Sequence, residues 1–205
     1  MQVIFEQLFA RFPALAAVQC EVLEAFDLLC GCFSAGGKLL LCGNGGSAAD
    51  CDHIAGELCK GFLRKRPLSE ADRSLFSDDA LAQHLQNGLP AVSLCAHSAL
   101  MTAVANDTDP ALIFAQQVWV YGERGKDLLM ALSTSGNSAN VLYAAKTAKA
   151  MDLPVLSVTG QDGGALLRES TVCIRLPASE TYQVQELTLP LYHALCAAAE
   201  AHFFK

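Results

Sequence analysis

The sequence is poor in charged residues and lacks the patterns of several common functional classes. Only 17% of its 205 residues are charged, 52% are hydrophobic, and the net charge is −7. No run of Lys and Arg is dense enough for a nucleic-acid interface, and no apolar run is long enough to cross a bilayer. The densest basic stretch, residues 60–66, is interpreted as a solvated loop or helix end because acidic residues follow it. We therefore expect neither a nucleic acid nor a membrane as partner.

Cysteine is abundant, but its spacing is not that of a metal site. The nine cysteines are odd in number and include no C-x-x-C pair. Most of them lie in hydrophobic runs, where a thiol packs as a small apolar group. The start of the chain also lacks the basic, apolar and small-residue segments of a secretory leader. These features predict a reduced, cytoplasmic protein.

Strand and helix patterns alternate along the chain and predict one α/β domain over residues 1–205. Residues 1–36 have helical periodicity interrupted at Pro13 and are expected to pack helices in an oligomer, for which the apolar composition is suited. Residues 64–88 are polar and irregular and form an extended insertion. Strands are predicted at 38–42, 91–94, 128–132, 154–158 and 173–176. Helices between such strands imply a parallel sheet that is flanked by helices on both faces.

Two polar turns each follow a predicted strand and begin a helix. Ser133-Thr134-Ser135-Gly136-Asn137-Ser138 follows one strand, and Gly43-Asn44-Gly45-Gly46-Ser47 follows another. Free N–H groups and the dipole at a helix N-terminus favour anions, whereas simple capping needs only one polar residue. Ligands of parallel α/β sheets bind beyond the carboxyl ends of the strands. The turns therefore predict a phosphate site made by Asn44, Gly45, Ser47, Ser133, Thr134, Ser135 and Ser138.

The motifs resemble those of a known family. Five motifs occur in the order found in SIS (sugar isomerase) domains and, within that family, in the phosphoheptose isomerases. They are the two turns, Asn106-Asp107, Thr159-Gly160-Gln161-Asp162-Gly163-Gly164 and Gln185-Glu186. The resemblance implies a flavodoxin-like three-layer αβα fold and a homotetramer with active sites at subunit interfaces. It also implies conversion of sedoheptulose 7-phosphate to D-glycero-D-manno-heptose 7-phosphate. The segment from about 64 to 88 is longer than in those enzymes.

The same resemblance implies a zinc site. His53 and Glu57 are four residues apart, a spacing that by itself is more typical of an ordinary contact on a helix surface. In phosphoheptose isomerases the matching positions bind zinc, together with a glutamine and a histidine of the last helix. One zinc ion per subunit is therefore expected, held by His53, Glu57, Gln185 and His193.

An enediol route for the isomerisation assigns roles to these side chains. Glu57 is the candidate base, His193 the candidate acid, and Gln185 a substrate contact. Asp107 is interpreted either as a sugar contact or as a helix cap, and His97 as a capping or packing residue. The alternative is a non-catalytic SIS protein that binds phosphosugars, regulates, or associates with a replication initiator. The presence of Glu57 and His193 favours the enzyme.

Two residues, one in the predicted terminal helix 183–203 and one just before it, depart from the expected pattern. Pro190 lies between Gln185 and His193, where it removes a backbone hydrogen bond and can kink the helix. Tyr182 stands where some phosphoheptose isomerases carry an acidic residue. Both departures bear on substrate specificity.

Overall fold

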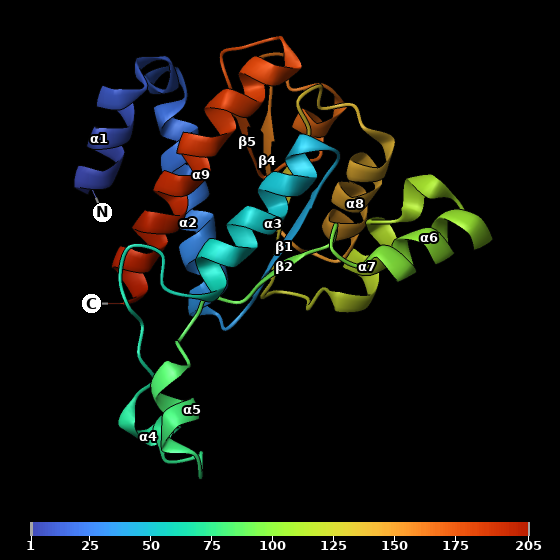
Figure 1. The fold of residues 1–205 in the computed structure, drawn as a ribbon. Coiled ribbons are helices and arrows are strands. Elements are labelled where there is room, and N and C mark those ends of the chain that lie inside the picture. The colour runs from blue at the N-terminus through green and yellow to red at the C-terminus, as the bar shows by residue number, and fades with distance from the viewer. Residues whose placement is uncertain (1, 205) are drawn as a thin grey trace.

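A five-stranded parallel sheet forms the centre of the protein, with helices on both of its faces (Figure 1). The computed structural model describes residues 2–204. The strand order β2-β1-β3-β4-β5 is that of flavodoxin-like folds, which confirms the predicted fold class. The strands are β1 (Leu39–Gly43), β2 (Ala91–Ser93), β3 (Leu128–Leu132), β4 (Val155–Thr159) and β5 (Val172–Arg175).

Two hydrophobic clusters separate the helices into two layers. The larger cluster packs one face of the sheet against the N-terminal helices, the helix after β1 and the terminal helix. These are α1 (Gln2–Arg11), the 3₁₀ helix η1 (Pro13–Val18), α2 (Gln19–Ser34), α3 (Gly46–Cys59) and α9 (Thr181–Phe203). The helices on the side of the smaller cluster are α6 (Ser98–Asp107), η2 (Pro110–Leu112), α7 (Ala115–Tyr121), α8 (Ala139–Ala150) and η3 (Ala165–Arg168). The predicted break at Pro13 is confirmed.

Helix α9 continues without interruption through Pro190. The proline has no N–H to donate, yet the helix extends 13 residues beyond it. Buried side chains on both sides of Pro190, including Val184, Leu191 and Leu195, hold the helix against the sheet. The two candidate residues Gln185 and His193 are therefore carried by one helix.

The insertion forms an arm that extends away from the body of the protein (Figure 1). It contains two short helices, α4 (Glu70–Arg73) and α5 (Asp79–His84). An antiparallel bridge between Pro67 and Gln86 closes its neck. The prediction that residues 60–66 are solvated is wrong at Arg66, which is 2% exposed. Its counter-charge, Glu200, lies 134 residues away in the sequence, so no local pattern indicated the burial.

The polar turns lie together at the carboxyl ends of the strands. Gly136 has a φ of 65°, and a Cβ at this position would clash with the carbonyl oxygen of Gly163. The turn after β3 therefore packs backbone to backbone against the turn after β4, which only glycine permits.

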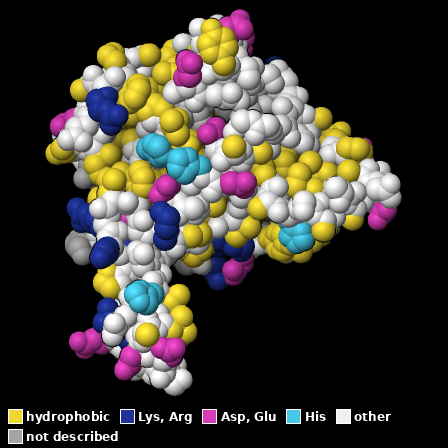
Figure 2. All heavy atoms as spheres, in the orientation of Figure 1, with side chains coloured by type: hydrophobic (Ala, Val, Ile, Leu, Met, Phe, Trp, Pro, Cys, Tyr) yellow, Lys and Arg dark blue, Asp and Glu magenta, His cyan; other side chains and the backbone are white. Residues whose placement is uncertain are grey.

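The surface shown in Figure 2 combines broad hydrophobic areas with scattered charges. Large hydrophobic side chains are more than half exposed at Val3, Trp119, Val120 and Tyr182. Within residues 2–204, no helix has both the length and the apolar character required to cross a membrane.

A buried carboxylate aligns the two central strands. Asp127, which is fully buried, precedes β3, and Lys38 precedes β1. The Asp127 carboxylate accepts hydrogen bonds from the Lys38 backbone N–H (2.8 Å), the Lys38 ammonium and the Glu123 N–H (2.7 Å). One side chain thus ties together the starts of β1 and β3.

Replacing Asp127 by Ala should lower the free energy of unfolding by about 3 kcal/mol, because three donors lose a buried, charged acceptor. Lys126→Ala is the control, since Lys126 pairs only with Glu123 at the surface and should change stability by less than about 0.5 kcal/mol. Urea unfolding followed by circular dichroism measures both. Equal stability of the two variants would contradict the assignment.

Candidate active site

A cavity of about 290 Å³ lies where the strand order reverses, between the ends of β1 and β3. Ligands of doubly wound sheets bind at such switch points. Most of the predicted phosphate contacts line this cavity, and none of its lining residues is Lys or Arg. Its lining residues are Asn44, Gly45, Gly46, Ser47, Leu132, Ser133, Thr134, Ser138, Thr181 and Gln185.

Three helices present N-termini to this cavity without side-chain caps. The N-cap residues are Gly45 for α3, Ser138 for α8 and Glu180 for α9, and none of them accepts a capping hydrogen bond. By contrast, Asp78 caps α5 and His97 caps α6, the latter as expected. Uncapped N–H groups and aligned helix dipoles attract an anion. The cavity is therefore suited to a phosphate although it has no basic side chain.

The hydroxyl of Ser138 is engaged within the turn. It lies 3.1 Å from the hydroxyl of Ser133. Each hydroxyl has one proton, which it can donate either to the other hydroxyl or to an oxygen in the cavity. Asn44 is held by Asn140, which no sequence pattern had indicated: the two side chains exchange two hydrogen bonds of 2.9 Å. This amide pair joins the glycine turn to α8 and fixes the width of the cavity.

Two predicted contacts lie outside this cavity. Ser135 is exposed and lines a neighbouring cavity of about 250 Å³ that shares Thr134, and its hydroxyl accepts from the Asn137 N–H. Asp107 is the last residue of α6, is exposed, and accepts a hydrogen bond from the Asn106 side chain. The fold thus separates Ser135 and Asp107 from the other candidates, and their roles stay predictions.

A second group of candidate residues lies along the contact between α3 and α9. The His53 Nε2 is 3.2 Å from the Glu57 Oε1, and the rings of His53 and His193 are 5.0 Å apart at 84°. Figure 2 shows two histidine side chains side by side, surrounded by hydrophobic groups. The tertiary structure therefore brings together both candidate catalytic residues and His53.

Tyr192 and Asp50 orient the ring of His53. The Tyr192 hydroxyl lies 2.9 Å from His53 Nδ1 and donates to Asp50 Oδ1 at 3.3 Å. Burial and the neighbouring Asp50 raise the pKa of Tyr192, so its single proton stays in place. When Tyr192 donates to Asp50, His53 Nδ1 is the donor to Tyr192 and Nε2 carries a lone pair; when Tyr192 donates to Nδ1, Nε2 carries the proton and donates to Glu57.

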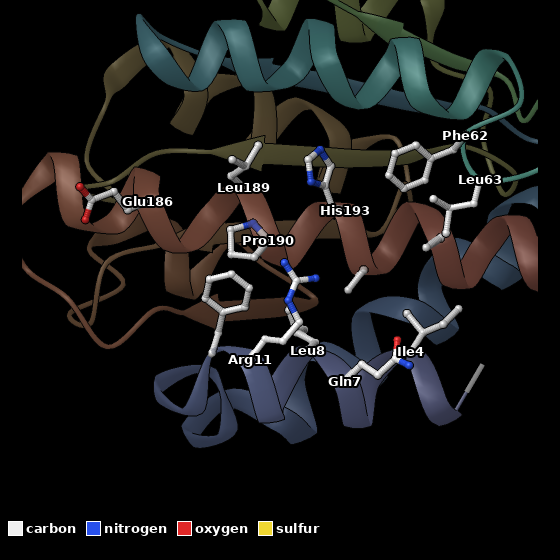
Figure 3. Close-up of a pocket in the computed structure, with 13 residues that line it drawn as sticks. Ile4, Gln7, Leu8, Arg11, Phe62, Leu63, Glu186, Leu189, Pro190 and His193 are labelled. Carbon is white, nitrogen blue, oxygen red and sulfur yellow. The ribbon is translucent and has the colours of Figure 1, made fainter.

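His193 projects from α9 toward α3 above a groove between α1 and α9 (Figure 3). The groove has a volume of about 380 Å³ and is lined by Phe62, Glu186 and Arg11 among others. Burial, and then the charge of His53, lower the pKa of His193, while Glu57 opposes the shift. The imidazole is therefore neutral at pH 7. Its Nε2 is buried and has no hydrogen-bond partner among the described residues.

The donor atoms of this group fit a zinc ion in type. The His53 Nε2 lies 3.2 Å from the Glu57 Oε1, and in the tautomer that leaves a lone pair on Nε2 these two acceptors need a cation between them. The buried Nε2 of His193 also lacks a partner. Among residues 2–204, however, no three His, Cys, Asp or Glu side chains are arranged as a metal centre.

Gln185 lies apart from the three other expected ligands. It is eight residues before His193, about 12 Å along the helix axis. Its side chain packs so closely on Gly46 that a Cβ there would clash with it. Gln185 thus faces the cavity of the glycine turn.

Some residues of the site were missed by the sequence analysis. Asp50, His53 and Glu57 recur at spacings of three and four, and this common helix face was a signal for Asp50. Tyr192, Thr181 and Asn140 carry no comparable signal, since their roles depend on contacts with α3, the glycine turn and Asn44.

Comparisons with known proteins agree with this fold and site. Two SIS-domain family models match, one over residues 123–199 and the other over 10–96 and 80–160. The phosphoheptose isomerase of Thiobacillus denitrificans is 37% identical over 195 residues, which cover 94% of this chain and 88% of that protein. The one of Methylibium petroleiphilum is 38% identical over 199 residues, or 96% and 89% of the two chains.

Solved structures give the same result. The phosphoheptose isomerase of Neisseria gonorrhoeae aligns with a TM-score of 0.74 and 32% identity, over 95% of this chain and 94% of that one. The one of Francisella tularensis aligns with a TM-score of 0.76 and 29% identity, over 96% and 94%. The match spans the sheet, both polar turns and the helices that carry His53, Glu57 and His193, so this chain belongs to the phosphoheptose isomerase family of SIS-domain proteins.

Proposed function

We propose that this protein isomerises a seven-carbon sugar phosphate, converting sedoheptulose 7-phosphate to D-glycero-D-manno-heptose 7-phosphate. The observation that carries the proposal is the double role of α3. Its uncapped N-terminus borders the cavity of the polar turns, and its His53 and Glu57 lie against His193 further along the helix. A phosphate site and a group able to transfer protons are thus joined by one rigid element.

The separation along α3 suits a substrate of this length. Gly46 and His53 are seven residues apart, which is about 10 Å along the helix. An extended heptose phosphate spans a comparable length between its phosphorus and its reacting carbons. With the phosphate between the polar turns, the carbonyl end reaches the level of His53 and Glu57.

The chain's own residues then supply the proton transfers. Glu57, whose side chain is 16% exposed, takes the proton from C1 of the ketose and returns one to C2. His193 is neutral because burial lowers its pKa; its N–H gives a proton to O2 as that oxygen gains charge, and the ring recovers a proton from O1 as the aldehyde forms. The surrounding rings of Phe62, Tyr192 and His53 limit the access of water to His193.

We further propose that His53, Glu57 and His193 hold one zinc ion; Gln185, whose side chain packs on Gly46, would join them as fourth ligand by turning along α9 toward His193. When bound, the ion would stabilise negative charge on the oxygens of the substrate. Tyr192, which contacts His53 Nδ1 and is itself bound to Asp50, would orient the His53 ring. Carboxylates commonly orient metal-binding histidines in this way.

A homotetramer is proposed for the working state. It is supported by the exposed hydrophobic side chains of Val3 on α1, Trp119 and Val120 on α7, and Leu189 on α9. The nine free cysteines suit a reducing compartment such as the cytoplasm.

Ser138→Asp tests the phosphate cavity. Aspartate is a good N-cap, so α8 should keep or gain stability, but its carboxylate would face the phosphate. We expect loss of measurable phosphosugar binding in calorimetry, with an unchanged or higher Tm. Ser69→Asp, at the N-cap of α4 in the arm, is the control and should leave binding intact. Unchanged affinity in Ser138→Asp would exclude this cavity as the phosphate site.

The zinc site is tested by metal content. Protein stripped with a chelator and given zinc should retain one ion per subunit at pH 7.5, and should lose it progressively below about pH 6 as imidazoles become protonated. The lowered pKa of His193 keeps this ligand neutral further into acid than an ordinary histidine. His53→Ala should abolish retention, whereas His84→Ala, in the arm, should not. Equal zinc in both variants would disprove the ligand set.

The proton-transfer roles are tested by Glu57→Gln and His193→Asn, each of which should reduce turnover of sedoheptulose 7-phosphate about 100-fold or more. Glu24→Gln, at an exposed position on α2, is the matched control. Zinc content is measured in every variant, so that loss of metal is distinguished from loss of the acid or base. In heavy water, the wild-type product should carry deuterium at C2. A wild-type protein that binds heptose phosphates but turns none over would instead be a binding or regulatory SIS protein.

A further inference from the structure

A buried ion pair joins the end of α9 to the segment that follows α3. The Arg66 Nε lies 2.9 Å from the Glu200 Oε1, and the two side chains are 0% and 1% exposed. The guanidinium also lies 4.5 Å from the ring centroid of Phe204. Such a pair has a high desolvation cost and persists only when further hydrogen bonds satisfy both groups. The other hydrogen bonds of Arg66 and Glu200 therefore indicate the role of the pair.

The Arg66 guanidinium binds the last turn of α3. It donates from Nη1 to the carbonyl oxygen of Leu58 at 2.7 Å and from Nη2 to that of Glu57 at 3.4 Å. These carbonyls belong to the helix end, where α3 itself has no further N–H to offer them and where a cation is favoured by the dipole. The Leu58 carbonyl also accepts the Leu89 N–H at 2.9 Å, whereas Arg66 is the partner from the neck of the arm. Arg66 thus holds the backbone of Glu57 itself.

The Glu200 carboxylate binds the chain just after α3. Its two oxygens accept the backbone N–H groups of Phe62 and Leu63, both at 2.8 Å. Burial alone would raise the pKa of Glu200, but these two N–H groups and Arg66 outweigh burial and lower it, so the carboxylate is charged. Phe62 is thereby fixed with its ring 5.5 Å from that of His193, at an angle of 36°. Figure 3 shows Phe62 beside His193 on the side of α9 that faces α3.

The pair therefore contacts the site from both sides of the α3–α9 seam. Through Arg66 it reaches Glu57, and through Glu200 and Phe62 it reaches His193. Hydrophobic residues of similar volume can often replace a buried ion pair without loss of stability. They cannot donate to two carbonyl groups or accept from two N–H groups, so the pair is suited to orientation more than to stability.

We propose that Arg66 and Glu200 are positioning residues for catalysis, which set the placement of Glu57 relative to His193. The inference rests on the proposed isomerase function. It also gives the arm a fixed attachment to the site, because Arg66 lies at the neck and its carbonyl accepts the Asn87 N–H at 2.7 Å. A misplacement of about 1 Å in a catalytic group can cost about 100-fold in rate.

The decisive variant is the double replacement Arg66→Met with Glu200→Leu. It removes both charges together, so no buried charge is left unpaired, but the N–H groups of Phe62 and Leu63 lose their acceptor; Tm should fall moderately, and the assays are run well below it. The kcat for sedoheptulose 7-phosphate should fall about 10- to 100-fold, while KM changes less than about 3-fold, because the phosphate cavity lies at the other end of α3. Lys65→Met, one residue away and exposed, is the control and should match the wild type.

Two further measurements separate positioning from stability. Arg66→Lys keeps the charge but not the planar fork that reaches two carbonyl groups, so kcat should stay low even where Tm is restored. Hydrogen exchange at the N–H groups of Phe62 and Leu63 should accelerate in the double variant under conditions where the amides of the central sheet keep their wild-type protection. A double variant with wild-type kcat and wild-type protection of these two amides would overturn the proposal. An inactive wild-type protein would instead contradict the proposed function. The exchange data would still show whether the Arg66–Glu200 pair holds the backbone of Phe62 and Leu63.

Discussion

The parallel packing of α3 against α9 is the contact on which the candidate site depends. The two helices meet at three successive levels: Gly46 with Gln185, His53 with His193, and the end of α3 with Glu200 through Arg66. Each level lies about two helical turns from the next, so a shift of one helix would displace all three. The absence of a side chain at Gly46 permits the first contact, because a Cβ there would clash with Gln185. The cavity of the polar turns, the group of His53, Glu57 and His193, and the arm are thus arranged along the contact between α3 and α9.

Charge is distributed unequally along this seam. The cavity of the polar turns contains no Lys or Arg among its lining residues and offers three uncapped helix N-termini and several hydroxyls. A site of this kind binds an anion through fixed dipoles, which cost little to reorganise. The opposite end of α3 carries a buried arginine, where the helix dipole favours a cation. The dipole of α3 therefore makes its N-terminus suited to an anionic ligand, and at its C-terminus it stabilises the contact with Arg66.

Sequence reasoning succeeded where the signal was local. The strands 39–43, 128–132 and 155–159 are fully buried and nearly continuous in apolar residues, and all were predicted within one residue. The two turns at their carboxyl ends were placed correctly because parallel strands bring such ends to one edge of the sheet. It failed at Arg66, which looked like part of a solvated basic stretch, and it could not find Tyr192 or Asn140, whose partners are 139 and 96 residues away.

The sequence by itself determined the fold class, the break at Pro13, the polar turns and the residue types of the candidate site, because periodicity, glycine and helix-end chemistry act over a few residues. Only the tertiary structure decided which of those residues meet. It placed His53, Glu57 and His193 together, turned Gln185 toward Gly46, and left Ser135 and Asp107 outside the main cavity. The physical reason is that these contacts join segments more than 100 residues apart. Their geometry is fixed by the packing of α3, α8 and α9 on the sheet and by a buried charge pair, none of which leaves a local pattern in the chain.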